Sequence, residues 1–284
     1  MAGTGPDEVI ARVPSLSGTP RTITPLPGGL TNRNYKVVTP DGEFVARIWA
    51  AQAGPLAIDR EQEYRNSCIA AAAGAGAPVI DYRPQDRVLV LRYLPGKTFR
   101  NADVRDPANL PRIAAALRRL HAAPPFAGDF DMFEVQARYR AAAVAAGIGV
   151  PPGYDDLGHA FAAARSVLAV AAEPAVPCNN DLLAANFIDD GDRVWLIDYE
   201  YAGNNDPCFE LGNIAGECGL DNDELAALVT AYYGRPRPSR VARARLFIPF
   251  SQYGWTLWGA IQAAQASLTS PEFPRLLAAV QEGD

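Results

Sequence analysis

Short segments in which apolar and polar residues alternate occupy the first third of the chain, and glycine or proline residues separate them. Such alternation is typical of strands with one buried face. It predicts strands at 21–26, 34–38, 43–49, 79–82 and 87–93. A helix is predicted after the third strand, because Asp59 can cap its start while Gly74 and Gly76 end it. We therefore expect residues 1–94 to form an antiparallel five-stranded sheet with one helix.

Apolar residues recur at helical spacing in the rest of the chain, beyond the connection formed by residues 94–96. Helices are predicted at about 106–121, 131–146, 156–172 and 221–233, and from about 207 and 239 onward. Asp106 followed by Pro107 is typical of a helix start, and Asp221 with Glu224 is typical of a capping box. Residues 95–284 should form a mainly helical lobe, so the expected fold class is α+β with two lobes.

Composition narrows the class of protein. The 284 residues are 49% hydrophobic and 20% charged, which is ordinary for a globular chain able to bury a sizeable core. A net charge of −6 argues against nucleic-acid binding and suits a cationic substrate. No apolar run has the length of a membrane span, and the N-terminus lacks a secretion-signal pattern, so we expect a cytoplasmic protein with no membrane span.

Cysteine and histidine usage argues against two further classes of site. The four cysteines show no metal-ligand spacing, and only two histidines are present, so a zinc site is not expected. Both histidines, His121 and His159, lie far in sequence from any serine or cysteine motif. A hydrolase triad therefore has no support, and we expect His121 to pack or cap at the end of its helix.

The candidate chemistry lies between residues 178 and 203. Asp181 and Asn186 have the spacing D-x-x-x-x-N, and Asp198 follows at the end of a short predicted hairpin. Kinases use this arrangement to move a γ-phosphoryl group, with one Asp as base and the Asn with the second Asp on magnesium. Each residue alone is an ordinary turn former. Together they predict a site for a nucleotide and Mg²⁺.

Two features of the first lobe fit such a site. The loop of residues 27–32, which contains Gly28 and Gly29, can bring backbone N–H groups close to an anion, although an ordinary hairpin turn explains a glycine pair equally well. Arg47 lies within an apolar strand and can contact nucleotide phosphates, the alternative being a solvated arginine on an edge strand. Glu63 is the first candidate to pair with Arg47, and Glu61 is the second.

An aromatic pair marks the last predicted helix. Trp255 and Trp258 are three residues apart, so they share one helix face, with Gln262 about one turn further along. Such a pair can be part of the core or can form one wall of a ligand pocket.

The chain resembles the choline/ethanolamine kinase family, within the protein-kinase-like group that also holds aminoglycoside phosphotransferases. The resemblance is carried by the strings LPGGLTNRNY, FVARIW, IDREQEY, CNNDLLAANF, IDYEYAG and WTLWGAIQ. Arg47, the IDYEYAG string, FELGN with Glu217, and W-x-x-W are the parts that separate it from aminoglycoside kinases. The resemblance implies a bilobed protein-kinase-like fold with ATP and Mg²⁺ in the cleft.

The resemblance also implies roles for individual residues. Asp181 would be the catalytic base. The metal would be held by Asn186 and Asp198, with Glu200 as a supporting acid nearby. The nucleotide would be contacted by Gly28, Gly29, Thr31, Asn32, Arg47 with Glu63, Arg92, Tyr93 and Leu94. A small cationic alcohol would be enclosed by Tyr201, Glu217, Trp255 and Trp258, where ring faces attract an ammonium group.

The sequence departs from the family pattern at two positions. Asn179 stands where the family usually has His, which puts the support of the catalytic loop in question, and Glu210 stands where Asp is usual. The expected activity is ATP- and Mg-dependent phosphorylation of choline or a related amino alcohol. The alternatives are a kinase of a larger cationic molecule such as an aminoglycoside, and a catalytically weak protein that binds a nucleotide or an ammonium ligand.

Overall fold

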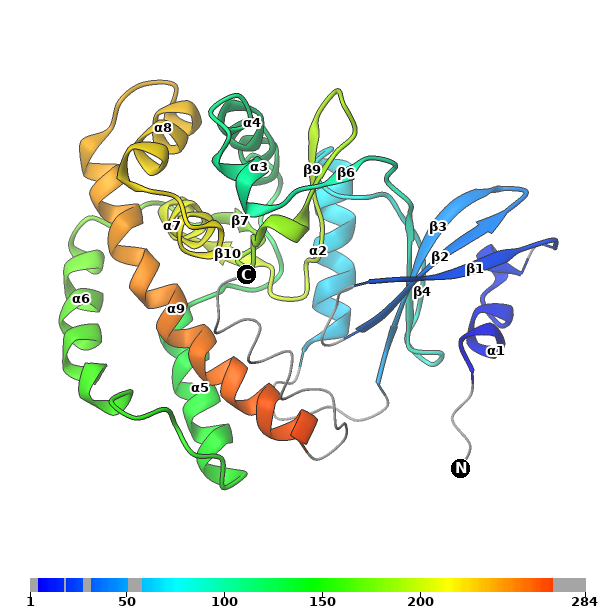
Figure 1. Ribbon diagram of the computed structural model, residues 1–284, viewed down its shortest axis with the longest axis horizontal. Helices are drawn as coiled ribbons and strands as arrows, with labels where there is room; N and C mark the ends of the chain where they lie inside the picture. Colours follow the sequence, from blue (N-terminus) through cyan, green and yellow to red (C-terminus); the bar gives the residue numbers. More distant parts are fainter. Residues whose placement is uncertain (1–4, 18, 28–31, 51–57, 268–284) are drawn as a thin grey trace.

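The five-stranded sheet lies at one end of the molecule, and most of the helices lie at the other (Figure 1). The computed structural model describes residues 5–17, 19–27, 32–50 and 58–267. The expected α+β architecture with two lobes is confirmed within these residues. None of their helices is long and apolar enough to cross a lipid bilayer.

The first lobe is built on a five-stranded antiparallel sheet with strand order β1-β2-β3-β5-β4. Its strands are β1 (Thr22–Leu26), β2 (Asn32–Thr39), β3 (Gly42–Trp49), β4 (Val79–Arg83) and β5 (Val88–Arg92). All five predicted strands are therefore present, with ends within two residues of the prediction. A small apolar core lies between the sheet and the N-terminal α1 (Pro6–Ala11), where Ile10, Leu16, Val37 and Ala46 are inaccessible to solvent.

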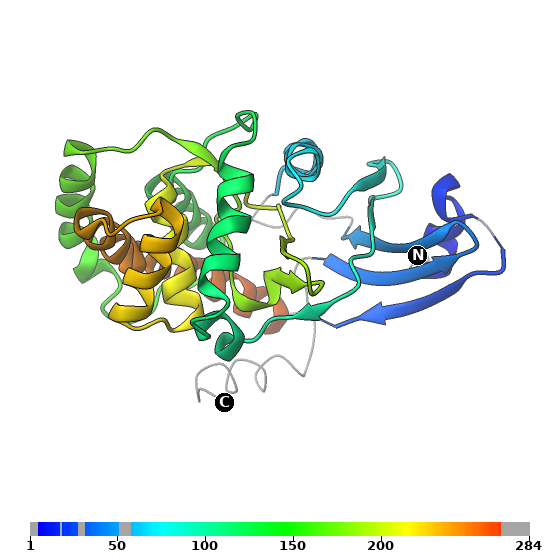
Figure 2. The same ribbon diagram turned by 90° about the horizontal axis from the view of Figure 1, so that it is seen from above.

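Helix α2 (Arg60–Ala72) lies between the sheet and the helical lobe (Figure 2). The side chain of Asp59 caps it as predicted, accepting a hydrogen bond from the Gln62 amide at 3.0 Å. The buried positions of this helix are mostly polar, and include Glu63 and Asn66. Asn66 donates to the Ala202 carbonyl in the other lobe at 2.8 Å. This helix face is thus matched to polar groups of the second lobe.

The second lobe is organised around α7 (Pro207–Cys218), in which ten residues are buried. The other helices are α3 (Asn101–Arg105), α4 (Leu110–His121), α5 (Met132–Ala145), α6 (Gly158–Val170), α8 (Asn222–Tyr233) and α9 (Pro238–Ser267). Close packing of α7 against α9 requires Gly212, since a Cβ at this position would overlap the backbone carbonyl of Ala244. The closely packed helices α7 and α9 support the segments that precede α7 in the chain.

One predicted helix start is wrong. Asp106 and Pro107 lie between α3 and α4, and α4 begins at Leu110. The Asp106 side chain accepts a hydrogen bond from the Ala108 amide at 2.9 Å. Aspartate before proline suits a turn of this kind as well as a helix cap, so the local signal was ambiguous. The capping box of Asp221 and Glu224 at the start of α8 is confirmed.

Short strands flank the loops that lie between the lobes. β7 (Val176–Cys178) pairs with β10 (Gly203–Asn205), and β8 (Phe187–Asp189) forms the predicted hairpin with β9 (Val194–Leu196). β6 (Lys97–Thr98) pairs with β8 directly after the connection at residues 94–96. The segment from residue 178 to 203 is therefore anchored at both of its ends by β7 and β10.

Candidate active site

A loop between β7 and β8 presents Asp181. Its backbone is held by side chains of α7, because Glu210 Oε1 accepts from the amides of Asn179 and Asn180 at 2.5 Å and 3.0 Å. Asn213 Oδ1 accepts from the Leu182 amide at 2.8 Å. Buried backbone donors that are paired in this way fix the loop against the helix. The position of Asp181 is thus set by residues about thirty positions later in the chain.

Asn179 supports this loop. Its Nδ2 donates to the carbonyls of Ile197 and Asp198 at 3.1 Å and 2.9 Å, and its Oδ1 accepts from the Asp181 amide at 3.1 Å. The amide therefore connects the loop of Asp181 to the segment of Asp198. The question raised by the absence of histidine at this position has a structural answer, since Asn179 makes three hydrogen bonds there.

Asn180 is the second amide that the loop requires. It has a left-handed backbone (φ 69°), which asparagine tolerates better than most residues. Its Nδ2 lies within 3.1 Å to 3.3 Å of the carbonyls of Cys178, Tyr201 and Gly203. These contacts tie the start of the loop to the segment that carries Tyr201.

Two of the three candidate metal ligands, Asn186 and Asp198, flank the β8–β9 hairpin, one before β8 and one after β9. Asn186 Nδ2 donates to the Asp181 carbonyl at 2.6 Å, and the Asn186 carbonyl accepts from the Ile197 amide at 3.0 Å. Asp198 also has a left-handed backbone (φ 65°), a conformation that costs energy outside glycine. Asn179 and Arg47 hold it there through its carbonyl and its carboxylate. The fold thus brings Asn186 and Asp198 to the loop of Asp181.

Arg47 joins the lobes at this point. It lies on β3, in the centre of the sheet, and is 6% exposed, so the alternative of a solvated edge arginine is wrong. Its Nη2 lies 2.7 Å from Asp198 Oδ1, 3.3 Å from Glu63 Oε1 and 3.7 Å from Glu200 Oε2. The predicted contact with Glu63 is present, but Asp198 is the nearer partner. These carboxylates raise the pKa of Arg47 and outweigh the opposing effect of its burial.

The sequence did not identify Arg60 as part of this cluster. Arg60 Nη1 lies 2.7 Å from Glu63 Oε2 and 3.5 Å from Glu200 Oε2. Asn32 Nδ2 donates to the same oxygen of Glu200 at 3.0 Å. The one sequence feature that could have indicated this role is the position of Arg60, three residues before Glu63 at the start of α2. Glu61, the second candidate for Arg47, instead pairs with Arg65 on the exposed side of the helix.

The charges of this cluster fit a divalent cation and a phosphate chain. Two arginines face the carboxylates of Glu63, Asp198 and Glu200, which leaves one net negative charge before Asp181 is counted. Carboxylate and amide oxygens are the ligands that Mg²⁺ prefers. Arg47 Nε is a buried donor without a hydrogen-bond partner among the described residues, and a phosphate oxygen is a suitable acceptor for it.

Asp181 lies where several acidic groups converge. Burial raises its pKa well above the ordinary value, and nearby carboxylates raise it further. Those carboxylates belong to Asp198, Glu217 and Glu200. A carboxyl group with a raised pKa is a stronger base when ionised, which suits a residue that accepts a hydroxyl proton.

Three of the remaining nucleotide candidates lie at the end of β5 and in the connection that follows it. Arg92 ends β5, and its guanidinium lies 4.7 Å from the centre of the Phe44 ring. The Tyr93 amide donates to the Glu43 carbonyl at 3.0 Å, and Leu94 follows it half-buried. Gly28, Gly29 and Thr31 lie outside the described residues. The adenine and phosphate contacts of all these positions remain predictions.

Aromatic side chains cluster around Tyr201, on which Asp181 acts electrostatically. Tyr201 and Trp255 meet edge to face with ring centres 4.8 Å apart, and Trp258 Nε1 donates to the Tyr201 hydroxyl at 2.6 Å. Trp255 and Trp258 are edge to face at 6.4 Å. The fold therefore brings together the three aromatic residues that the resemblance named. Tyr139 of α5, which the sequence did not single out, is almost fully buried against the core behind them.

Glu217 completes the set of predicted residues. It lies in the last turn of α7, half-buried, and acts electrostatically on Asp181. Burial raises the pKa of Glu217. No hydrogen bond or ion pair to its carboxylate is present among the described residues. An ammonium group would provide such a partner.

Comparison with known proteins gives the family. The pattern of the phosphotransferase enzyme family matches residues 22–245. Protein LicA of Haemophilus influenzae is 29% identical over 211 residues, covering 72% of this chain and 61% of LicA. Ethanolamine kinase 2 of Mus musculus is 28% identical over 244 residues, covering 75% of this chain and 62% of that protein. The chain thus spans about three fifths of these relatives.

A solved structure extends the match to nearly the whole chain. The crystal structure of a choline/ethanolamine kinase family protein from Mesorhizobium loti aligns with a TM-score of 0.78 and 30% identity. The alignment covers 96% of this chain and 97% of that one. The resemblance predicted from the sequence and the protein-kinase-like fold are both confirmed.

Proposed function

This chain belongs to the phosphotransferase enzyme family, and from that premise we propose that it transfers the γ-phosphoryl group of ATP to the hydroxyl of choline or a related amino alcohol. One observation carries the proposal. Asp181 lies within electrostatic reach both of Glu200 and Asp198, which belong to a cluster of paired charges, and of Tyr201, which belongs to a cluster of aromatic rings. The first cluster suits a phosphate chain and the second an ammonium group.

The reaction requires little chemistry from the side chains beyond positioning. The hydroxyl oxygen of the amino alcohol attacks the γ-phosphorus, and its proton passes to the carboxylate of Asp181. The bond from the γ-phosphorus to the bridging oxygen breaks, and ADP leaves with that electron pair. Mg²⁺, when bound by Asn186 and Asp198, would neutralise charge on the transferring group. Arg47 stays paired with Glu63 and can direct its Nε, which has no partner in the described part of the chain, toward a phosphate oxygen.

Recognition of the amine follows from the aromatic cluster. A trimethylammonium group donates no hydrogen bond, so its selectivity must come from ring faces and a carboxylate. Tyr201, Trp255 and Trp258 supply the rings, and Glu217 supplies a carboxylate that has no other partner among the described residues. In a two-carbon amino alcohol the hydroxyl is close to the ammonium group. Binding of the ammonium by the rings therefore also positions the hydroxyl, which favours a small acceptor over an aminoglycoside.

The first test is ADP release by the purified protein with Mg-ATP, measured separately for choline, ethanolamine, their methylated intermediates and a set of aminoglycosides. We expect turnover with one or more of the small amines. Asp181→Asn should lower kcat by about 10²- to 10⁴-fold, the usual contribution of a general base, with the fold retained. Turnover no faster than that of Asp181→Asn with every acceptor would leave a binding protein, and turnover with aminoglycosides alone would replace the substrate class.

A further inference from the structure

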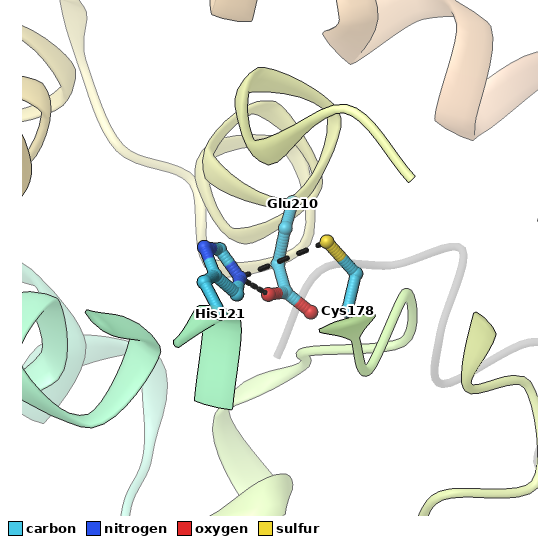
Figure 3. A group of neighbouring side chains, drawn as sticks. All are labelled: His121, Cys178 and Glu210. Carbon is cyan, nitrogen blue, oxygen red and sulfur yellow. Dashed lines mark hydrogen bonds and ion pairs between the residues drawn. The ribbon is translucent and has the colours of Figure 1, made fainter. Parts of the chain in front are cut away.

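A buried histidine, carboxylate and thiol lie together directly behind the catalytic loop (Figure 3). His121 ends α4, Glu210 lies in the first turn of α7, and Cys178 ends β7 immediately before Asn179. Glu210 and Cys178 are inaccessible to solvent, and His121 is 8% exposed. No partner for His121 could be identified from the sequence, because these residues come from three separate elements.

The hydrogen bonds of this cluster form a continuous chain. His121 Nε2 contacts Glu210 Oε2, and His121 Nδ1 lies 2.7 Å from the hydroxyl of Tyr232 on α8. Glu210 Oε1 accepts from the two loop amides of Asn179 and Asn180. With its proton on Nε2, a neutral His121 donates to Glu210 and accepts from Tyr232, so every group in the chain has a partner.

The same contacts argue against a metal site. The nearest ligand atoms lie within 4.8 Å of one another, which a metal ion could bridge. However, both oxygens of Glu210 already accept hydrogen bonds, and burial with the charge of Glu210 raises the pKa of the Cys178 thiol. A neutral thiol is a poor metal ligand and a poor nucleophile. The cluster is therefore organised as a hydrogen-bonded support.

We propose that His121 and Tyr232 are positioning residues for the catalytic loop, acting through Glu210. Glu210 can hold the two loop amides with one oxygen only while its other oxygen is fixed. His121 provides that fixed donor, and Tyr232 sets the orientation of the imidazole ring. Without His121, a buried carboxylate oxygen loses its partner and the carboxylate is free to rotate toward another donor.

The backbone of the loop makes this support necessary. Asn180 has a left-handed conformation, and its amide is one of the two that Glu210 holds. Asp181 follows directly, so a change in the angles at Asn180 displaces the carboxylate that accepts the proton. A displacement near 1 Å at a reacting group can lower a rate by about a hundredfold. This inference rests on the proposed function, since it assigns Asp181 as the base.

Matched variants on α8 and α4 separate this role from general packing. Tyr232→Phe removes the hydroxyl that contacts His121, and Tyr233→Phe removes the neighbouring hydroxyl, which lies 3.4 Å from Cys208 Sγ and outside the chain of hydrogen bonds. His121→Phe keeps a ring but removes both nitrogens. His121→Gln restores a donor near the position of Nε2.

We expect His121→Phe to lower kcat by about 10- to 100-fold, with KM for ATP and for the amine unchanged. Tyr232→Phe should lower kcat by about fivefold, the equivalent of one hydrogen bond. His121→Gln should recover most of the lost rate, and Tyr233→Phe should match the wild type. Equal rates for Tyr232→Phe and Tyr233→Phe, or no recovery by His121→Gln, would overturn the proposal.

Hydrogen exchange of the loop amides tests the same positioning role without a measurement of turnover. Amides within residues 178–183 should exchange faster in Tyr232→Phe than in Tyr233→Phe, measured by mass spectrometry in the absence of ATP and amine. If the wild type phosphorylates none of the amines, the proposed function fails. The exchange comparison still tests whether His121 and Tyr232 hold the loop, because it does not depend on turnover. Should His121→Phe fail to fold, the two tyrosine variants decide the outcome. Identical exchange in both contradicts the proposal.

Discussion

The two sides of the active site are built in different ways. The charged side joins the lobes, because Arg47 and Arg60 belong to the sheet and α2 while Asp198 and Glu200 belong to the helical lobe. The aromatic side lies wholly within the helical lobe, between the segment after β9 and helix α9.

This difference predicts how each side responds to ligands. Ion pairs between lobes must exchange partners when a metal ion takes Asp198, so the charged side should rearrange and couple lobe position to the nucleotide. The aromatic rings already contact one another through Tyr201, so the amine side should be preformed. We therefore expect charged contacts to respond to the nucleotide and a preformed aromatic surface to receive the acceptor.

The largest effect should come from the charged side. Asp198→Asn removes a candidate metal ligand and the nearest partner of Arg47. We expect kcat to fall about a thousandfold, because several kcal/mol of charge stabilisation depends on the metal. ADP release should be measured over a range of Mg²⁺ concentrations, with Trp258→Phe as the control that keeps the wild-type Mg²⁺ dependence. A loss of less than about tenfold would remove Asp198 from the metal site.

Two arginines of α2 test whether the lobes are held by charge. Arg60 is 16% exposed and bridges Glu63 to Glu200, whereas Arg65 is 61% exposed and pairs with Glu61. Arg60→Gln should lower the free energy of unfolding by about 1.5–3 kcal/mol, as expected for hydrogen bonds to charged groups. Arg65→Gln should change it by less than about 0.5 kcal/mol. Urea unfolding of both variants makes the comparison, and equal losses would mean that the bridge contributes nothing.

Trp255→Leu tests the aromatic side, since it keeps apolar volume but removes the ring face. KM for choline should rise about 2- to 30-fold, corresponding to a cation–π contribution of about 0.5–2 kcal/mol. KM for ATP should stay unchanged. The neutral analogue 3,3-dimethylbutan-1-ol is the matched ligand, and its inhibition constant should change less than KM for choline. Equal changes for the charged and neutral ligands would assign Trp255 to packing alone.

The smallest effect should be the pH dependence of amine binding. Burial raises the pKa of Glu217, so this carboxyl takes up a proton at a higher pH than an exposed glutamate does. Attraction for the ammonium is present above that pKa and is lost as the pH falls through it. KM for choline should therefore rise a few-fold on the acid side, consistent with a half-buried charge. Glu217→Gln should give a KM that is high and independent of pH, and an unchanged pH profile in this variant would exclude the role.

Elements and candidate residues followed from the sequence alone. The alternation of apolar residues located all five strands of the sheet, and local capping signals at Asp59 and Asp221 located two helix starts. Asp106 failed as a helix start because turns and helix caps use the same local chemistry. Alternation and capping depend only on residues a few positions apart. A strand or a helix start can therefore be predicted from its own short segment of sequence.

Which side chains pair with one another was decided only by the tertiary structure. Arg47 and Asp198 are 151 positions apart, and Asn32 and Glu200 are 168 apart. His121 and Glu210 are 89 apart, and no periodicity or motif connects them. A side chain's charge and hydrogen-bonding capacity are local properties, but the group that satisfies them is set by how separate elements pack. The sequence alone therefore pointed to Asp181 as the candidate base, and packing alone determined which residues hold it in place.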